Sequence, residues 1–496
     1  MMGYISYFNV VKSRDIISSP YNKRQDSYAD RVIRGKILDR NGNVLAQTNV
    51  AEDGTETREY PYNNIFAHVV GYTAQGKSGL ESVSNFELLT SNAFFVDKLK
   101  NEFQDKKNQG DNVVTTLDTN LQEAAYDALG SNKGAVVVMD PTTGKILAMV
   151  SKPDFDPNTV SQNWNELSTS EDSVLLNRAT QGQYAPGSTF KIVAATAGVM
   201  EGVVGAYDTI NCTGKFQLIP PDVNCWIYSE RYKSGSHGPL TLSQAITESC
   251  NFYFNTVGYM LGKTSDFTNL TPETDADGNV VQSSTYNDAQ AISTLTKYAA
   301  MYGFDANTGI EIDETAPHVS TADGARTAMG QAGNTFTTSQ LSRYAATIAN
   351  NGTCYDLTLL DRITDSDNNT LEEPEPVVHS TVDLSSDLWD VIHSGMNGVY
   401  QNNAAFTDIK SSFNMAGKTG TAQENQDKPN HALFIGYAPY DTPEIAMAVR
   451  ITNGYSSTNA ASVAKDIVSY YFKLKDERDI ITNTAANVNV SNSFAD

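Results

Sequence analysis

Three short motifs follow one another along the chain, and each carries side chains that could do covalent chemistry. They are Ser188-Thr189-Phe190-Lys191, then Ser249-Cys250-Asn251, then Lys418-Thr419-Gly420. A serine hydroxyl is a weak nucleophile near neutral pH and needs a base within hydrogen-bond reach. Residues three apart share one face of a helix, so Lys191 can lie beside the Ser188 hydroxyl. The first motif therefore predicts a nucleophile, Ser188, with Lys191 as its base.

Lys191 can act as a base only if its amine loses its charge. The turn at 185–187 (APG) would open a helix, and the neighbouring Phe190, Ile192 and Val193 are apolar. Burial among such side chains lowers the pKa of a lysine, and the positive end of the helix acts in the same direction. Taken alone, the S-x-x-K pattern is more often the start of an amphipathic helix with an exposed lysine, so the other motifs decide the interpretation.

The second motif offers a hydroxyl and an amide. Ser249 could pass a proton between Lys191 and a leaving amine. Asn251 could hydrogen-bond a substrate amide and hold Lys191 in place. Alone, S-x-N is more often an ordinary polar helix face.

The third motif, on a predicted strand, offers groups for binding an anionic substrate end. Lys418 supplies positive charge, and the hydroxyls of Thr419 and Thr421 can donate to a carboxylate. Gly420 removes a side chain where substrate must approach the backbone. The backbone N–H groups of Ser188 and Thr421 are the expected donors to an oxyanion. Alone, K-T-G is more often a solvated strand end.

Other chemistries are not supported by the sequence. Gly417-Lys418-Thr419 is not the end of a P-loop, because position 412 is Ser412 instead of glycine and the strand–loop–helix order is missing. The six histidines form no H-E-x-x-H motif, and there is no G-x-S-x-G elbow. Residues 275–278 (DADG) resemble half of a calcium loop, but the last ligand position is Tyr286, so a solvated turn is predicted. We expect neither a metal nor a cofactor.

The chain has four cysteines: Cys212, Cys225, Cys250 and Cys354. Cys212 and Cys225 bracket Pro220-Pro221, so they could close a hairpin disulfide in an oxidising compartment or remain reduced core residues. The sequence leaves both possibilities open. Cys250 is interpreted as a packing residue.

The elements that must position these motifs can be predicted from patterning and turn signals. An Asn-Gly turn joins two strands within 34–46, and a hairpin covers 134–151 with a continuous β-branched run, so both faces of its first strand are expected to be covered. A polar loop is expected over 264–287. The predicted helices cover 118–129 (capped by Asp118 or Thr119), 188–201, 241–261, 286–303, 337–351 and 460–474, and the predicted late strands cover 416–424, 431–437 and 444–450.

Length and composition limit the number of domains and the kinds of partner that the chain can have. With 496 residues the chain can hold two to four domains, and a net charge of −23 disfavours a nucleic-acid partner. The sequence contains no run of 18 or more apolar residues, so no segment of it is expected to span a bilayer. The first eight residues (MMGYISYF) look like the end of a more hydrophobic segment, which suggests a chain cut just after a membrane anchor.

With the motifs in place, the chain resembles the class B penicillin-binding proteins over about residues 20 to 475. The similar segments are 34–46 (RGKILDRNGNVLA), 79–81 (GLE), 115–118 (TTLD), 177–179 (NRA), 184–191 (YAPGSTFK), 248–252 (ESCNF), 416–423 (AGKTGTAQ) and 432–439 (ALFIGYAP). The resemblance implies an α+β fold. We expect an irregular, mostly β pedestal at 1–113, a β-lactamase/transpeptidase-like domain with an antiparallel sheet flanked by helices at 114–475, and a disordered tail at 476–496.

The resemblance also implies a function. Ser188 would attack the D-Ala-D-Ala end of a peptidoglycan stem peptide, release D-Ala and pass the acyl group to an amine of a neighbouring peptide. β-Lactams would acylate Ser188 and stay. Members of the family carry one N-terminal membrane helix, act outside the bacterial cytoplasmic membrane, and work with a separate membrane glycan polymerase in elongation, division or sporulation.

The chain departs from the family pattern at two places. The sequence 329–334 (MGQAGN) replaces the frequent G-Q-G, which leaves the role of Gln331 open, and Leu433 stands where tryptophan is common. Two other functions are also considered. The second hypothesis is a serine β-lactamase or a D,D-carboxypeptidase, although a class A β-lactamase would need an E-x-x-L-N loop after Ser249, and none follows. The third hypothesis is a β-lactam sensor or a cell-wall scaffold. The stem-peptide chemistry, the β-lactam spectrum and the oligomeric state are not encoded in readable form.

Overall fold

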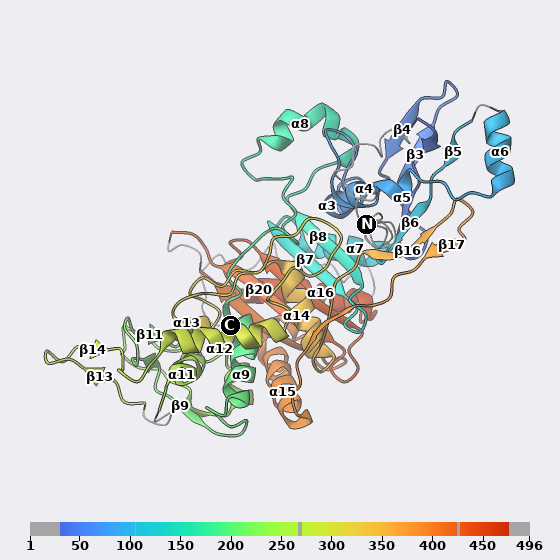
Figure 1. The fold of residues 1–496 in the computed structure, drawn as a ribbon. Coiled ribbons are helices and arrows are strands. Elements are labelled where there is room, and N and C mark those ends of the chain that lie inside the picture. The colour runs from blue at the N-terminus through green and yellow to red at the C-terminus, as the bar shows by residue number, and fades with distance from the viewer. Residues whose placement is uncertain (1–29, 105, 266–269, 424–426, 476–496) are drawn as a thin grey trace, which may run out of the picture.

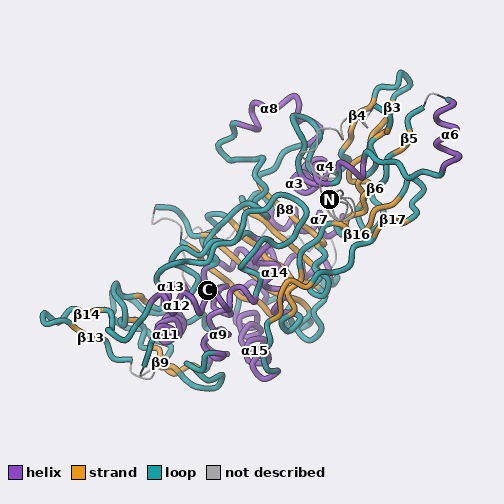
Figure 2. The backbone as a smooth tube through the Cα atoms, in the orientation of Figure 1, coloured by secondary structure: helices purple, strands orange, loops and turns teal. Residues whose placement is uncertain are grey.

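A computed structural model describes residues 30–104, 106–265, 270–423 and 427–475 (Figure 1). The predicted tail at 476–496 and the first eight residues lie outside this part of the chain. The N-terminal strands and short helices gather at one end of an elongated molecule, and the larger body surrounds a central sheet (Figures 1 and 2). Among the described residues, no helix is both long enough and apolar enough to cross a membrane.

The central sheet has five antiparallel strands in the order β19-β20-β21-β7-β8. They are β7 (Gly134–Met139), β8 (Ile146–Lys152), β19 (Ala416–Ala422), β20 (His431–Ala438) and β21 (Ile445–Ile451). All five strands were predicted to within two residues at either end. Because β19 is an edge strand, the backbone groups on its outer side are not used by this sheet.

Helices cover both faces of the sheet. The residues of β7 alternate between two cores: Val136 and Val138 pack with α7 (Thr119–Leu129) and α16 (Ser457–Tyr471), while Val137 packs toward the other helices. All of β7 is buried, which confirms the prediction that both its faces are covered. The Asp118 side chain caps α7 by accepting from the Leu121 N–H, as predicted.

On the second face of the sheet, α14 (Thr338–Ala349) packs against β7, β20 and β21, and α15 (Ser386–Asn402) packs against β19. The 3-10 turn η5 (Gly187–Phe190) also packs against β19 and leads into α9 (Lys191–Met200), which contacts α11 (Asn251–Gly262) and α12 (Asp288–Met301). The shorter α10 (Leu242–Thr247) packs against α15, and α13 (Gly324–Thr327) packs against α11 and α12. The helix α15 was not predicted, although its buried Leu388, Ile392, Met396 and Val399 recur at helical spacing.

The helix predicted at 241–261 is wrong in one respect: the structure divides it into α10 and α11. Ser249 between them has φ 49°, in the left-handed region. The chain turns there and restarts at Cys250, whose Sγ accepts from the Tyr253 N–H at 3.4 Å as the cap of α11. This break places Ser249 at a helix junction.

A second sheet links the N-terminal end to the body. Its six strands run in the order β17-β16-β6-β2-β3-β4. They are β2 (Ile37–Leu38), β3 (Val44–Val50), β4 (Glu56–Glu59), β6 (Asn112–Thr115), β16 (Leu360–Thr364) and β17 (Thr370–Glu372). The β2–β3 pair is the predicted hairpin. The domain boundary predicted after residue 113 falls inside β6, and β16 and β17 come from far later in the chain, so this sheet crosses it. The boundary itself stays a prediction.

The N-terminal end is tied together by a buried carboxylate. Glu81 accepts from Arg34 Nε at 2.6 Å and from Arg58 Nε at 2.7 Å. Burial raises the pKa of Glu81, but the two guanidinium groups outweigh it and leave the pKa below its ordinary value. Arg34 and Glu81 belong to two of the family-like segments, and this contact gives both a structural reason.

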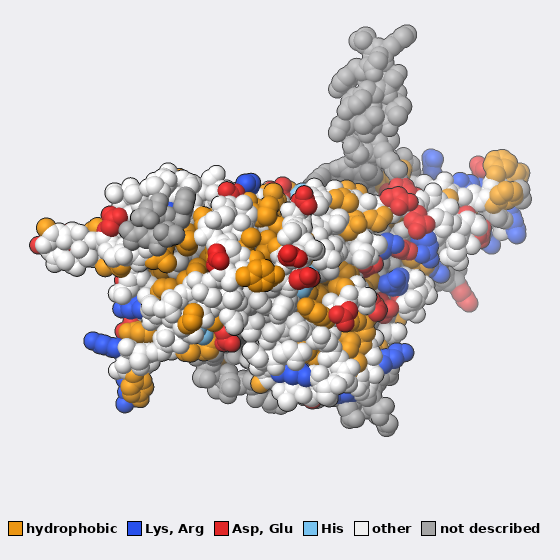
Figure 3. Space-filling model, turned by 90° about the horizontal axis from the view of Figure 1, so that it is seen from below, with side chains coloured by type: hydrophobic (Ala, Val, Ile, Leu, Met, Phe, Trp, Pro, Cys, Tyr) orange, Lys and Arg blue, Asp and Glu red, His pale blue; other side chains and the backbone are white. Residues whose placement is uncertain are grey.

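Shorter elements complete the fold. At the N-terminal end these are β1 (Val32–Ile33), β5 (Asn108–Gln109), η3 (Asn63–Phe66), α3 (Ala67–Val70), α4 (Gly79–Val83), α5 (Asn85–Leu88) and α6 (Phe95–Phe103). In the body they are η4 (Pro157–Thr159), α8 (Val160–Ser168), β9 (Ile210–Cys212), β10 (Lys215–Phe216), β11 (Val223–Asn224), β12 (Gly238–Leu240), β13 (Glu273–Thr274), β14 (Val280–Val281), β15 (Thr353–Tyr355), β18 (Val378–Thr381) and η6 (Ala404–Phe406). Asp and Glu side chains are scattered over the face seen in Figure 3.

The polar loop predicted at 264–287 contains one small hairpin, β13–β14. Asp275 caps the turn between its strands by accepting from the backbone N–H groups of Asp277 and Asn279. These contacts are those of a turn, as predicted.

Candidate active site

The predicted nucleophile lies in a turn that packs directly on the edge strand β19. Ser188 is in η5, one turn before Lys191, and only 5% of it is exposed. Gly187 has φ 52°, and a Cβ there would lie 2.6 Å from the Thr421 carbonyl oxygen. Glycine is therefore required at 187 for the turn to approach β19.

Lys191 brings the first and second motifs together. Its Nζ lies 2.8 Å from the Ser249 carbonyl oxygen, 3.0 Å from Ser249 Oγ and 2.8 Å from Asn251 Oδ1. The side chain is completely buried. The predicted contact between Asn251 and Lys191 is present, and three oxygen atoms surround the amine.

Lys418 brings the third motif to the same hydroxyl. Its Nζ lies 2.8 Å from Ser249 Oγ and 3.0 Å from the Thr419 carbonyl oxygen, and this lysine is also fully buried. Ser249 Oγ thus lies between two lysine amines that are far apart in the sequence. Lys418 was predicted to face substrate, and its contact with Ser249 was not predicted.

The loop that carries Ser249 is held from two sides. The Trp226 indole N–H donates to the Glu248 carbonyl oxygen at 2.9 Å. On the other side α15 packs closely against α10, and a Cβ at Gly398 would lie 2.2 Å from Thr247 Oγ1. The missed helix α15 therefore supports the left-handed turn at Ser249.

The rest of the K-T-G strand differs in part from expectation. A Cβ at Gly420 would lie 2.9 Å from Thr189 Cγ2, so this glycine is needed for packing against the nucleophile turn. Thr421 is 8% exposed, whereas Thr419 is fully buried and its Oγ1 has no hydrogen-bond partner among the described residues. Thr421 is the better placed of the two hydroxyls to meet a ligand.

Residues outside the motifs also hold the nucleophile turn. The Tyr344 hydroxyl on α14 donates to the Thr189 carbonyl oxygen at 3.1 Å. The Arg450 guanidinium on β21 stacks 3.6 Å from the centre of the Tyr184 ring, and burial lowers the pKa of Arg450 to about 10. Neither role could be read from the sequence, because each partner lies far along the chain.

The segment 329–334 and Leu433, which depart from the family pattern, both lie close to the nucleophile turn or to β19. In the segment 329–334 it is Gly330 that touches the site, because its carbonyl oxygen accepts from the Gly187 N–H at 3.2 Å. The Gln331 backbone N–H donates to the Arg326 carbonyl oxygen. Leu433 is buried on β20 directly opposite Gly420.

Comparisons with known proteins agree with this geometry. A family model described as "Penicillin binding protein transpeptidase domain" matches residues 134–469, and one described as "Penicillin binding protein A dimerisation domain" matches residues 34–113. The chain is 29% identical to the peptidoglycan D,D-transpeptidase PbpA of Mycolicibacterium smegmatis over 476 residues, covering 90% of this chain and 89% of that protein.

Two further relatives bear on the fold and the chemistry. The peptidoglycan D,D-transpeptidase MrdA of Acinetobacter baumannii is 26% identical over 486 residues, covering 86% of this chain and 67% of that protein. The solved structure of penicillin-binding protein A from M. tuberculosis, an imipenem acyl-enzyme complex, is 25% identical with a TM-score of 0.75, and the match covers 90% of this chain and 100% of that one.

Proposed function

Since this chain belongs to the class B penicillin-binding protein transpeptidase family, we propose that Ser188 forms the acyl-enzyme of a peptidoglycan D,D-transpeptidase. The observation that carries the assignment is the position of Ser249 Oγ, 3.0 Å from Lys191 Nζ and 2.8 Å from Lys418 Nζ. One hydroxyl thereby joins all three motifs beside the nucleophile turn. Such a constellation suits proton transfer in acyl transfer.

Acylation begins at Ser188. Neutral Lys191 takes the hydroxyl proton as Oγ attacks the carbonyl carbon of the penultimate D-Ala of a stem peptide. The backbone N–H groups of Ser188 and Thr421 stabilise the oxyanion. The amide C–N bond then breaks, the terminal D-Ala leaves as an amine after taking a proton, and the ester to Ser188 remains.

Hydrogen-bond counting explains how Lys191 can stay a base while fully buried. The Ser249 carbonyl oxygen and Asn251 Oδ1 can only accept, and a neutral amine has two N–H groups and one lone pair. If both N–H groups are donated to these oxygens, the lone pair is left to accept from a hydroxyl, and Ser249 Oγ lies 3.0 Å away. Ser249 Oγ can accept from Lys418 and relay its own proton toward the leaving amine.

Transfer of the acyl group reverses these steps. An amine from a neighbouring stem peptide attacks the ester carbonyl, loses a proton through Ser249 and Lys191, and releases Ser188 with its hydroxyl restored. The cationic Lys418 and the Thr421 hydroxyl, with Thr419 behind it on β19, bind the substrate carboxylate, and Asn251 binds its amide. Gly420 lets the substrate lie along the outer edge of β19, in the manner of an added strand.

The proposed reaction also determines the ligands, the cellular location and the partner of the enzyme. Peptidoglycan stem peptides and β-lactams are the ligands, and the enzyme acts at the extracytoplasmic face of the bacterial cytoplasmic membrane. Members of the class B family work with a separate protein that makes the glycan strands, so we propose a membrane glycan polymerase as partner. No cofactor takes part in these steps.

Intact mass after incubation with benzylpenicillin tests the assignment. We expect wild type to gain one penicilloyl group that persists for hours and maps to Ser188, and Ser188→Ala to gain none. Ser462→Ala serves as the matched control, because the Ser462 hydroxyl bonds within α16, away from the site.

Three outcomes would overturn the proposal. Rapid release of free penicilloate would indicate a β-lactamase. An adduct that persists on Ser188→Ala, or no adduct on wild type at all, would remove the acyl-enzyme from this site and favour a scaffold protein.

A further inference from the structure

The short helix α6 carries large apolar side chains that face water. Phe95, Leu99 and Phe103 follow one another at intervals of four residues, so they form one stripe along the helix. Phe95 is 72% exposed and Phe103 is 84% exposed, and Phe94, directly before the helix, is exposed as well. Apolar side chains gathered on one exposed stripe mark a contact surface.

The opposite side of α6 is the one attached to the rest of the protein. Asn101 lies roughly 160° around the helix from the middle of the stripe. Its Nδ2 donates to Asn108 Oδ1 at 3.1 Å, and its carbonyl oxygen accepts from the Lys106 N–H at 2.9 Å. The polar side therefore holds the helix in place, and the apolar side is turned outward, which is the reverse of an ordinary surface helix.

The position of α6 leaves the active site free. Figure 1 shows α6 at the tip of the N-terminal part, at the opposite end of the molecule from α9 and α11. Hydrophobic and basic side chains lie together at this end of the molecule in Figure 3. A contact through α6 can therefore form without covering the nucleophile turn.

An open hollow of about 840 Å³ lies beside the stripe. Phe95 and Leu99 form its apolar wall. Its charged lining consists of four basic and two acidic residues: Arg31, Lys98, Lys106, Lys107, Asp30 and Glu102. Lys107 forms an ion pair with Glu56 at 2.7 Å. The other three basic residues still outnumber the two acidic ones, so positive charge borders an apolar wall.

Charge is distributed unevenly between the two parts of the chain. Residues 1–113 contain 14 basic and 14 acidic side chains, so the whole net charge of −23 belongs to residues 114–496. A negatively charged surface therefore repels the body but not the end that carries α6. Such an asymmetry favours an approach to that surface with α6 first.

We propose that α6 docks on the surface of a bilayer that contains anionic phospholipids. The stripe enters the region of the acyl chains, and Arg31, Lys98 and Lys106 lie at the level of the lipid phosphates. Phe and Leu on one face, with lysines beside them, are typical of helices that lie in the plane of a membrane. The inference goes beyond the proposed function and uses it only for the presence of a membrane beside the protein.

Binding to lipid vesicles tests the docking. The whole chain is floated with vesicles of phosphatidylglycerol and phosphatidylcholine in equal parts, and its partition coefficient is measured without substrate. We expect wild type to bind, and Phe95→Ser/Phe103→Ser to bind about tenfold more weakly or less. Lys98→Glu/Lys106→Glu should also lose about tenfold at low ionic strength, and its binding should depend less on salt.

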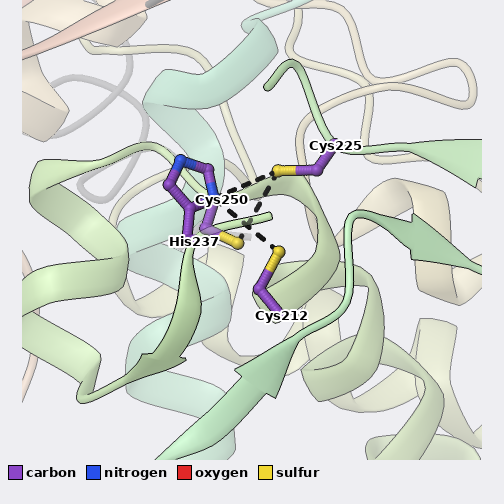
Figure 4. Close-up of side chains that lie close together, drawn as sticks. All are labelled: Cys212, Cys225, His237 and Cys250. Carbon is purple, nitrogen blue, oxygen red and sulfur yellow. Dashed lines mark hydrogen bonds between the residues drawn. The ribbon is translucent and has the colours of Figure 1, made fainter. Parts of the chain in front are cut away.

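Tyr207→Ser/Tyr232→Ser is the matched control. Both side chains are similarly exposed, at 70% and 69%, and both belong to the acidic body. Tyr232 lies in the loop between Cys225 and His237, which closes without a disulfide through a contact of 3.5 Å between Cys225 Sγ and His237 Nδ1 (Figure 4). The control removes as many exposed aromatic rings as the α6 variant, and it should bind vesicles like wild type.

A fluorescent reporter distinguishes insertion from loose attraction. Phe103→Trp adds an indole to the stripe, and lipids brominated on their acyl chains should quench the added emission. Tyr232→Trp adds an indole to the body, and the same lipids should leave its added emission unchanged.

Three results would overturn the proposal. One is a wild-type chain that does not bind the phosphatidylglycerol vesicles. Another is equal binding by wild type and Phe95→Ser/Phe103→Ser, which would place the affinity elsewhere, such as in residues 1–29. The third is unquenched emission from Phe103→Trp, which would indicate that a second copy or another protein covers the stripe. Acylation by benzylpenicillin should be the same in all these variants, so the docking and the proposed function can fail independently.

Discussion

At the scale of single residues, the site is organised around one hydroxyl. Ser249 Oγ lies between the Nζ atoms of Lys191 and Lys418, and all three side chains are buried. Two buried ammonium groups so close together would repel strongly. In the mechanism that we propose, a neutral Lys191 and a charged Lys418 bridged by Ser249 avoid this repulsion and take the separate roles of base and cation.

Ser249→Ala should therefore impair acylation more than it impairs folding. Without the hydroxyl, the two amines lose their shared partner and the proton relay is broken. We expect the second-order rate constant for benzylpenicillin acylation to fall about 100-fold or more. Stopped-flow measurements with a fluorescent penicillin give this constant, and thermal unfolding confirms the fold. Ser462→Ala should acylate normally, and a normal rate for Ser249→Ala would show that Ser249 does not relay protons.

At the scale of elements, the sequence predicted the strands and most long helices because their patterns are local. The valines of β7 and the Asp118 cap are examples. The break at Ser249 was not predictable, because its left-handed turn depends on α15 and on the Trp226 contact, both distant in sequence. For the same reason the motif residues were found, but the bond between Lys418 and Ser249 was not. The helix α15 had a readable signal, its apolar residues at helical spacing, that was overlooked.

The turn at Gly330 shows how one element sets the position of another. Gly330 has φ 86°, and a Cβ there would lie 1.8 Å from the Gly187 carbonyl oxygen, one residue before the nucleophile. Gly330→Ala should therefore displace the turn that carries Ser188. A displacement of about 1 Å costs about 100-fold in rate, so acylation should slow by roughly that factor.

Gly333→Ala is the matched control for this prediction. Gly333 also has a positive φ, 103°, but the nearest atom to an added Cβ is Ser320 Oγ at 3.7 Å. Backbone strain alone should cost this variant about 1 kcal/mol of stability and leave the acylation rate close to that of wild type. Equal acylation rates for the two variants would mean that contact with Gly187 does not position Ser188.

At the scale of the whole molecule, the N-terminal part and the body share one sheet and one apolar core. The six-stranded sheet takes β2, β3 and β4 from one and β16 and β17 from the other, with β6 between them. One apolar core is shared as well, since Ile37, Leu45 and Phe66 belong to the same cluster as Val137 and Met149. The N-terminal part is therefore a structural support for the sheet that carries the active site.

A fragment of residues 114–475 tests this view against a control of residues 30–475. The shorter fragment loses β2, β3, β4 and half of β6, so the β16–β17 hairpin has an open edge and part of the shared core meets water. We expect its unfolding temperature to fall by about 10 °C or more in calorimetry, whereas the longer fragment should unfold in one transition. If 114–475 keeps the stability and acylation rate of 30–475, the body folds alone, and the shared sheet is a docking contact between two independent domains.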